Sequence, residues 1–166
     1  MSFLSADQQA LATEIGTMLT ERGERVAVAE STTGGLISAA LLWVPGASRY
    51  FAGGGVVYTL NSRIALAGVS PEQYENYRGT TPEMLADLAE SMRARLEAAW
   101  GIGESGLAGP GPGRSGAPAG RTTLAVAGPV SRTSVIETGI DDRGENMSRF
   151  LTEALTFFRD AVREAS

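Results

Sequence analysis

Three hydroxyl residues stand next to one another in the segment 30–35, whose sequence is E-S-T-T-G-G. The largely apolar run 25–29 before it is typical of a buried strand, and the apolar segment 36–44 after it is typical of a helix. Backbone N–H groups without partners gather at such a turn, and with the helix dipole they favour an anion or a developing oxyanion. One hydroxyl would then be a candidate nucleophile. The alternative is structural: one hydroxyl caps the helix, and the two glycines allow close helix–sheet packing.

The side chains that most often do chemistry at neutral pH are missing from this chain. It has no histidine, no cysteine and, among its 14 basic residues, no lysine. These absences exclude a Ser-His-Asp triad, a thiol nucleophile, a lysine Schiff base and a Walker-type phosphate loop. Zinc sites almost always use His or Cys, so we expect no metal site. Catalysis would have to rest on Ser, Thr, Tyr, Asp, Glu, Arg and backbone amides.

A second glycine-containing segment, 105–110 (S-G-L-A-G-P), lies at the end of another expected strand, 103–107. In an open α/β sheet, ligands gather beyond the carboxyl ends of the strands. The segments 30–35 and 105–110 should therefore face one crevice. The stretch 111–116 that follows is interpreted as a flexible surface loop.

Single residues give weaker signals. Tyr58 ends an expected strand, where a tyrosine is more often a packing residue than an acid or a base. Arg63 and Arg143 each stand at the start of an expected helix, where a cation gains nothing from the helix dipole. That placement favours a task such as binding a phosphate, although a solvated surface arginine is the commoner case.

The elements that must position these residues alternate along the chain. Ser5 and Gln8 form an expected capping box, and Gly23 is the expected end of that first helix. Thr81 and Pro82 predict the start of another helix. The remaining expected elements are strands at 53–58, 122–127 and 134–140 and helices at 61–67, 82–100 and after 143. This order predicts one α/β domain over residues 1–166 with a mixed sheet, in which 122–127 and 134–140 pair antiparallel.

Composition narrows the function classes. The net charge of −5 argues against a nucleic-acid partner, which would need a basic surface to meet the phosphates. No apolar run reaches the roughly 20 residues that span a bilayer, and the N-terminus has no export signal. We therefore expect a cytoplasmic protein with neither a membrane nor a nucleic acid as its partner.

The segment 29–35, A-E-S-T-T-G-G, resembles the A-E-S-x-T-G-G signature of the CinA C-terminal domain family. Other segments match family motifs in the same order: G-A-S-R-Y-F at 46–51, G-V-V-Y at 55–58, L-A-G-V at 66–69, S-G-L-A-G-P at 105–110, P-A-G at 118–120 and D-R at 142–143. Each motif alone is weak, but their joint order and spacing are specific. The resemblance covers essentially the whole chain.

This resemblance implies a three-layer α/β/α domain with a mixed, mostly parallel sheet. The family includes competence/damage-inducible proteins, and its enzymes are nicotinamide-nucleotide amidohydrolases. These enzymes serve pyridine nucleotide salvage by hydrolysing the carboxamide of nicotinamide mononucleotide to nicotinate mononucleotide and ammonia, without a cofactor. A pyridine mononucleotide is thus the expected partner, and a homodimer is the family expectation.

The resemblance also assigns roles to residues. Ser31 would attack the carboxamide, and Tyr58 would assist proton transfer. The backbone amides of the turn would stabilise the oxyanion, which requires Ser31 to be open to solvent and close to the second glycine segment. The residues expected to form the oxyanion hole and hold the nucleotide are Thr32, Thr33, Gly34, Gly35, Ser105, Gly106, Ala108, Gly109, Pro110 and Arg143.

One catalytic position departs from the family. Its enzymes carry a general-base lysine five residues after the strand-ending tyrosine, and here that position is Arg63. An arginine has an ordinary pKa above about 12.5, so its neutral fraction at pH 7 is about one in a million or less. Two explanations stay open. Tyr58 or Glu30 replaces the lysine as the base, or the chain is a nucleotide-binding homologue that has lost the amidase step.

Overall fold

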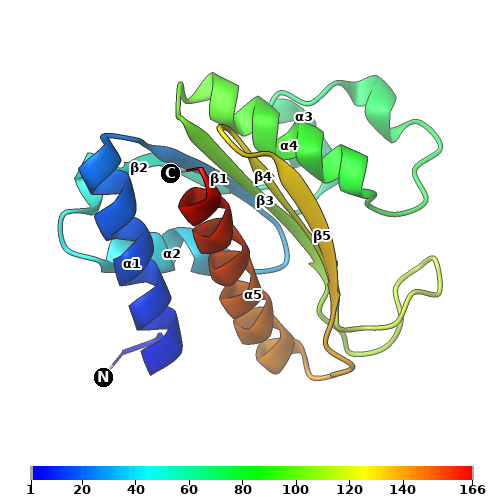
Figure 1. The fold of residues 1–166 in the computed structure, drawn as a ribbon. Coiled ribbons are helices and arrows are strands. Elements are labelled where there is room, and N and C mark those ends of the chain that lie inside the picture. Colours follow the sequence, from blue (N-terminus) through cyan, green and yellow to red (C-terminus); the bar gives the residue numbers. More distant parts are fainter. Residues whose placement is uncertain (1, 166) are drawn as a thin grey trace.

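A five-stranded mixed sheet forms the middle layer of the computed structural model, which describes residues 2–165 (Figure 1). The strands are β1 (Val26–Glu30), β2 (Phe51–Val56), β3 (Trp100–Leu107), β4 (Arg121–Ala127) and β5 (Arg132–Glu137). They lie in the order β2-β1-β3-β4-β5. β1 is parallel to β2 and β3, whereas β4 is antiparallel to β3 and β5. Four strands therefore share one direction, which confirms a mixed, mostly parallel sheet.

Helices cover both faces of this sheet (Figure 1). One face carries α1 (Ala6–Arg22), α2 (Leu36–Trp43) and α5 (Arg143–Glu164), and the other carries α3 (Leu60–Ala65) and α4 (Pro82–Arg95). Two short 3₁₀ helices, Ala47–Arg49 and Pro71–Tyr74, lie in the connections. The three-layer α/β/α prediction is confirmed. β2 begins and ends two residues earlier than expected, so Tyr58 lies beyond the strand.

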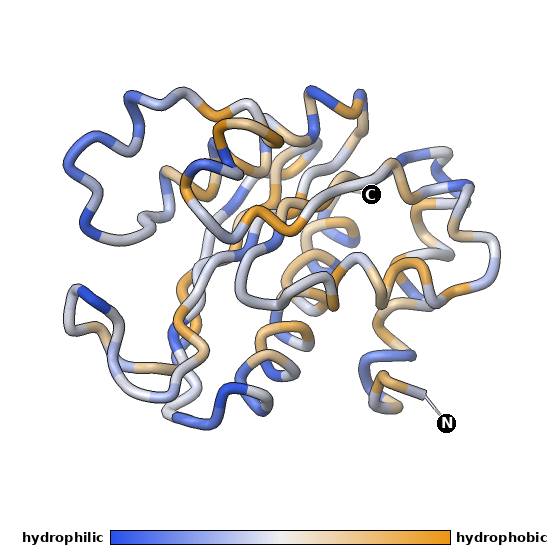
Figure 2. Tube along the Cα trace, turned by 180° about the vertical axis from the view of Figure 1, so that it is seen from behind, coloured by the Kyte–Doolittle hydropathy of each residue, from blue (hydrophilic) through white to orange (hydrophobic). Residues whose placement is uncertain are grey.

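Local sequence signals explain where the helices begin and end. The Ser5 and Gln8 capping box of α1 is present, and Gly23 closes this helix in the left-handed conformation with φ of 65°. The hydroxyl of Thr81 caps α4, and the carboxylate of Asp142 caps α5. Figure 2 shows hydrophobic segments running through the middle of the molecule and hydrophilic residues on the outer loops.

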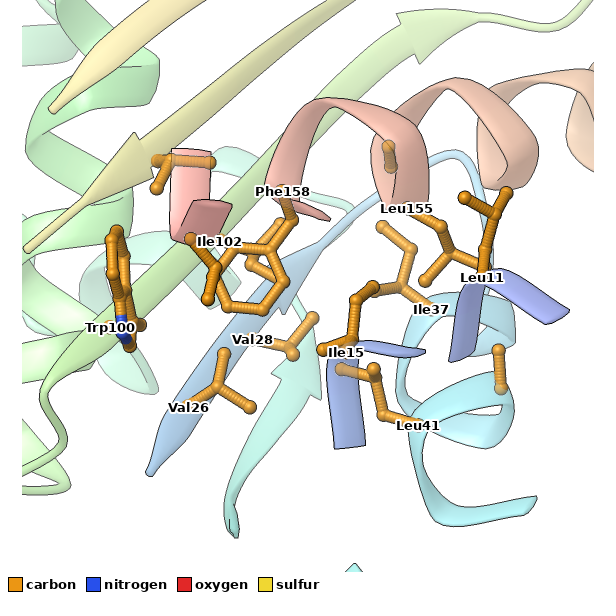
Figure 3. Close-up of a cluster of buried hydrophobic side chains, with 14 of the residues drawn as sticks. Leu11, Ile15, Val26, Val28, Ile37, Leu41, Trp100, Ile102, Leu155 and Phe158 are labelled. Atoms are coloured by element: carbon orange, nitrogen blue, oxygen red, sulfur yellow. The ribbon is translucent and has the colours of Figure 1, made fainter. Parts of the chain in front are cut away.

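The alternation of side chains along β1 separates two hydrophobic cores. Val26 and Val28 point into the larger core, among the helices α1, α2 and α5 (Figure 3). Ala27 and Ala29 point the other way, toward α4. Because β3 also presents glycines to α4, the backbone of this helix lies very close to the sheet.

The Gly101→Ala substitution is expected to destabilise the protein. A Cβ at Gly101 would lie 2.3 Å from the carbonyl oxygen of Ala89, so α4 would have to move away from the sheet. We expect the free energy of unfolding to fall by about 1–3 kcal/mol in urea denaturation. Gly55→Ala is the matched control, because the nearest atom to its Cβ lies 3.9 Å away. Equal stability of the two variants would contradict this packing argument.

Candidate functional site

The two glycine-containing segments meet at the carboxyl ends of neighbouring parallel strands. Glu30, at the end of β1, stands in register with Glu104 on β3. Immediately beyond this pair, the N–H of Gly106 donates a 2.6 Å hydrogen bond to the Thr32 hydroxyl. The prediction that these segments face each other is confirmed, because parallel strands bring their carboxyl ends to the same edge of the sheet.

A cavity of about 180 Å³ opens beside this contact. Its lining contains Tyr58 and Arg143, Thr32 of the turn 30–35, which we call the hydroxyl turn, and most of the second glycine segment. The full lining is Thr32, Tyr58, Gly106, Leu107, Ala108, Gly109, Pro110, Gly111, Pro112, Gly113 and Arg143. Of the residues expected to bind the nucleotide, Thr33, Gly34, Gly35 and Ser105 are absent from this lining. The segment 111–113, interpreted as a plain surface loop, contributes to the cavity.

The wall formed by the second glycine segment is tied to the start of α5. Arg143 donates a 2.6 Å hydrogen bond to the carbonyl oxygen of Gly109. The buried amide of Asn146 donates to the carbonyl oxygens of Ala108, at 2.9 Å, and Ile140, at 2.8 Å. Sequence reasoning missed Asn146. The available signal was its position one turn before Phe150, on the face of the helix that is otherwise apolar.

Two buried carboxylates organise the hydroxyl turn. Glu30 and Glu104 are both fully buried. Glu30 accepts N–H hydrogen bonds from the first residues of α2, and Glu104 accepts them from the turn itself at Ser31 and Thr33. The Thr33 hydroxyl lies between the two, 2.6 Å from one oxygen of Glu30 and 2.9 Å from one oxygen of Glu104. Neither carboxylate was expected to have this role.

These carboxylates correct the predicted oxyanion hole. The N–H groups of Thr33 and Gly35 donate to Glu104 and Glu30, at 2.9 Å each, and that of Gly34 donates to the Ser31 carbonyl oxygen. Within residues 2–165, only the N–H of Thr32 in this turn donates to no acceptor. A side-chain anion already satisfies the helix N-terminus that we expected to serve a ligand. Gly34 and Gly35 are still required, because both have positive φ, 63° and 103°.

Ser31 is more enclosed than predicted. The residue is only 4% exposed, so the expectation of a solvent-open hydroxyl is wrong for this structure. Its Oγ accepts a long hydrogen bond of 3.5 Å from Nη2 of Arg63, and it donates to no acceptor in the described part of the chain. The expected closeness to the second glycine segment does hold, because the same Nη2 donates to the Ser105 hydroxyl at 2.7 Å.

Arg63 lies beside Ser31, as the resemblance to the family implies. The residue is only 3% exposed, and its guanidinium reaches across from α3 to Ser31 and Ser105 at the ends of β1 and β3. Nε donates to the carbonyl oxygen of Val57 at 3.1 Å, and Nη1 donates to the Thr80 hydroxyl at 3.3 Å. The atoms that accept hydrogen bonds from Arg63 are all uncharged oxygens. Within residues 2–165, no carboxylate oxygen lies within 4 Å of its nitrogens.

The two residues considered as replacement bases, Tyr58 and Glu30, form no hydrogen bond with the Ser31 hydroxyl within residues 2–165. Tyr58 is 57% exposed at the cavity wall, and its hydroxyl has no hydrogen bond to any residue that the structure describes. Both oxygens of Glu30 are occupied by donors of α2 and of the turn. In this conformation, therefore, no side chain is positioned to accept the Ser31 proton.

A further tyrosine, Tyr74, lies near Arg63. Burial raises the pKa of the Tyr74 hydroxyl, and the positive charge of Arg63 lowers it in part. The net direction is upward, so Tyr74 stays a neutral phenol at neutral pH. It cannot supply the negative charge that Arg63 lacks.

Within 2–165, no cluster of three or more His, Cys, Asp or Glu side chains is arranged to hold a metal ion. None of the helices in that range combines the length and the apolar character that crossing a bilayer requires.

Comparison with known proteins gives one consistent result. The family model described as the CinA C-terminal domain matches residues 8–162. The chain is 47% identical over 116 residues to a CinA-like protein of Acidobacterium capsulatum, which covers 70% of this chain and 28% of that protein. It is 40% identical over 154 residues to a CinA-like protein of Synechocystis, covering 92% and 37% respectively. The chain thus spans about a third of the length of these curated relatives.

Solved structures agree with the sequence matches. The crystal structure of a competence/damage-inducible protein from Agrobacterium tumefaciens superposes with a TM-score of 0.90 at 29% identity, covering 98% of this chain and 99% of that one. A CinA superfamily protein from Enterobacter cloacae superposes with a TM-score of 0.86 at 27% identity, covering 100% and 99%. On the match of the family model and of these relatives, the chain belongs to the CinA C-terminal domain family.

Proposed function

We propose that this chain binds a pyridine mononucleotide in the cavity beside Thr32 and lacks the amide-hydrolysing step of the family's enzymes. The observation that carries this proposal is the hydrogen bond from the Arg63 guanidinium to the Ser31 hydroxyl. A guanidinium that stays protonated at neutral pH has donors only, so it cannot remove the proton of the nucleophile.

The cavity has the features that a nucleotide site needs. Among the glycines of the lining, Gly111 has no atom within 4 Å of the place where a Cβ would be, so a ligand can approach its backbone closely. Arg143 supplies a positive charge at the wall, where it can meet a phosphate. Thr32 also lines the cavity, and its N–H donates to no acceptor within residues 2–165, so it is available as one further donor. This distribution suits an anionic phosphate at one end of the ligand and a polar ring substituent near Thr32.

The missing step is proton removal. A serine hydroxyl is a weak nucleophile until a neighbouring base accepts its proton. Arginine stays protonated at neutral pH, so Arg63 attracts electron density at the Ser31 oxygen without taking its proton. General-base catalysis contributes about 100-fold to 10,000-fold to such reactions, and this contribution is absent here.

The second candidate is the complete amidohydrolase, with Ser31 as nucleophile and the acid and ammonia as products. The contact between Arg63 and Ser31 also gives it some support, because a cation beside the attacked carbonyl would stabilise the oxyanion together with the N–H of Thr32. In that case Tyr58 would have to move from the cavity wall to accept the proton.

Ammonia release separates the two candidates. Wild-type protein incubated with nicotinamide mononucleotide is expected to release ammonia no faster than the Ser31→Ala variant, while calorimetry detects binding of the mononucleotide to the wild type. Ser31→Ala is a suitable control because it removes the hydroxyl and leaves the backbone hydrogen bonds of the turn in place. Release that exceeds this control would establish the amidohydrolase, and the absence of binding of both the amide and the acid form of the mononucleotide would refute the nucleotide site.

A further inference from the structure

Arg63 is a buried cation that forms no ion pair with a carboxylate within residues 2–165. It is 3% exposed, and its hydrogen bonds all end on neutral oxygens, those of Val57, Ser31, Ser105 and Thr80. Leaving a buried charge unpaired costs several kcal/mol, so such groups are normally paired or bound to a ligand. The two nearby carboxylates, Glu30 and Glu104, do not pair with Arg63, because they accept hydrogen bonds from the backbone of the hydroxyl turn and of α2.

The surroundings of Arg63 are chemically suited to an anion. Three hydroxyls, those of Ser31, Ser105 and Thr80, lie against the guanidinium at 3.5, 2.7 and 3.3 Å. Each of them carries a proton that it can donate to an incoming anion. A planar guanidinium matches a planar carboxylate through two parallel hydrogen bonds. We call Arg63, Ser31, Ser105 and Thr80 together the Arg63 cluster.

The Arg63 cluster adjoins the nucleotide cavity. Ser31 and Ser105 directly precede Thr32 and Gly106, which line that cavity and are joined by a hydrogen bond. None of the four cluster residues lines the cavity itself, so a ring substituent would have to reach them past Thr32 and Gly106. On the opposite side the cluster ends at Thr80, which is partly exposed and contacts the hydroxyl of Tyr77.

We propose that the Arg63 cluster binds a carboxylate, so that this chain prefers the acid form of a pyridine mononucleotide, nicotinate mononucleotide, over the amide form. The inference rests on the proposed function, because it names the ligand of the same cavity. A carboxylate neutralises the unpaired charge of Arg63, whereas a neutral carboxamide does not. The acid is also the product of the hydrolysis that the family's enzymes perform. A chain without the hydrolytic step would then recognise the product.

Calorimetric titration of the wild-type protein with both mononucleotides tests this preference. We expect nicotinate mononucleotide to bind at least about tenfold more tightly than nicotinamide mononucleotide, a difference of about 1.4 kcal/mol. In Arg63→Gln the ratio of the two affinities should fall to about one. A purely structural arginine would change both affinities together and leave their ratio intact. If Arg63→Gln does not fold, the wild-type ratio alone decides the matter.

Two controls make the outcomes distinct. Arg143→Gln removes a charge from the cavity lining and is expected to weaken both mononucleotides without changing their ratio. Free nicotinate and nicotinamide test the cluster without the nucleotide, and the same preference for the acid is expected. Equal or tighter binding of the amide would overturn the carboxylate proposal while the nucleotide site stands. Binding of free nicotinate alone, with neither mononucleotide bound, would refute the nucleotide site and support the cluster.

Discussion

The Arg63→Lys variant is expected to release ammonia from nicotinamide mononucleotide at least about 100-fold faster than the wild type. Burial lowers the pKa of a lysine, so a lysine at this position would be partly neutral at pH 7. A neutral amine close to the Ser31 hydroxyl can accept its proton, which the guanidinium cannot do. The distance between Arg63 and Ser31, 3.5 Å, shows that the two side chains already face each other.

Two controls accompany this variant. Arg63→Gln removes the charge without supplying a base, so it should release no more ammonia than the wild type. Adding Ser31→Ala to Arg63→Lys should abolish the gain. If the wild type releases ammonia as fast as Arg63→Lys, and both exceed the Ser31→Ala control, the amidase step does not depend on a base at this position. The second candidate function would then replace the first.

The Glu30→Gln variant is expected to lose about 3 kcal/mol of unfolding free energy, whereas Glu104→Gln should change it by less than about 1 kcal/mol. One oxygen of Glu30 accepts the N–H groups of Gly35 and Ile37, and the other accepts the N–H and the hydroxyl of Ser38. Whichever way a glutamine amide turns, its NH₂ group meets buried backbone N–H donors. That conflict leaves donors unsatisfied at the start of α2.

Glu104 differs from Glu30 because only one of its two carboxylate oxygens accepts backbone N–H groups. One oxygen accepts the N–H groups of Ser31 and Thr33, and the other meets only the hydroxyl of Thr122. A glutamine can present its carbonyl oxygen to the backbone and its NH₂ to Thr122, whose hydroxyl can accept. The substitution also removes one of two negative charges that are buried close together.

The midpoint of thermal unfolding, determined for both variants, tests this prediction. A loss of 3 kcal/mol corresponds to a fall of roughly 10 °C in the unfolding midpoint of a domain of this size. The comparison within this pair cancels effects common to any replacement of a buried glutamate. Equal losses in the two variants would show that the number of donors at each oxygen does not set the stability of the turn.

Much of the architecture could be predicted from the sequence, because it depends on local signals. The capping box of Ser5 and Gln8 begins α1, and Gly23 ends it. Thr81 begins α4, and Asp142 begins α5 just before Arg143. Such signals act within a few residues, through side chains that satisfy free backbone groups at helix ends. The crevice between the two glycine segments followed as well, since it needs only that two parallel strands end at one edge.

Local signals could not predict which donors and acceptors of the site are already engaged in hydrogen bonds. Glu104 reaches the turn from 73 residues away, and Arg63 reaches Ser31 from 32 residues away. Whether the turn's N–H groups are free for an oxyanion depends on these partners and on the register that sets Glu30 beside Glu104. Residue types at positions 31–35 say nothing about which distant carboxylate will occupy their donors.

Residue patterns alone predicted the class of fold and the place of the crevice, and they put an arginine at position 63, where the resemblance to the family implies a lysine. Three properties of the site depend on long-range packing within residues 2–165: Ser31 is enclosed, the turn keeps one N–H without an acceptor, at Thr32, and buried Arg63 forms no ion pair. The physical reason is that elements form from nearest-neighbour patterns, whereas a site's charge balance depends on which long-range contacts the packed sheet and helices allow.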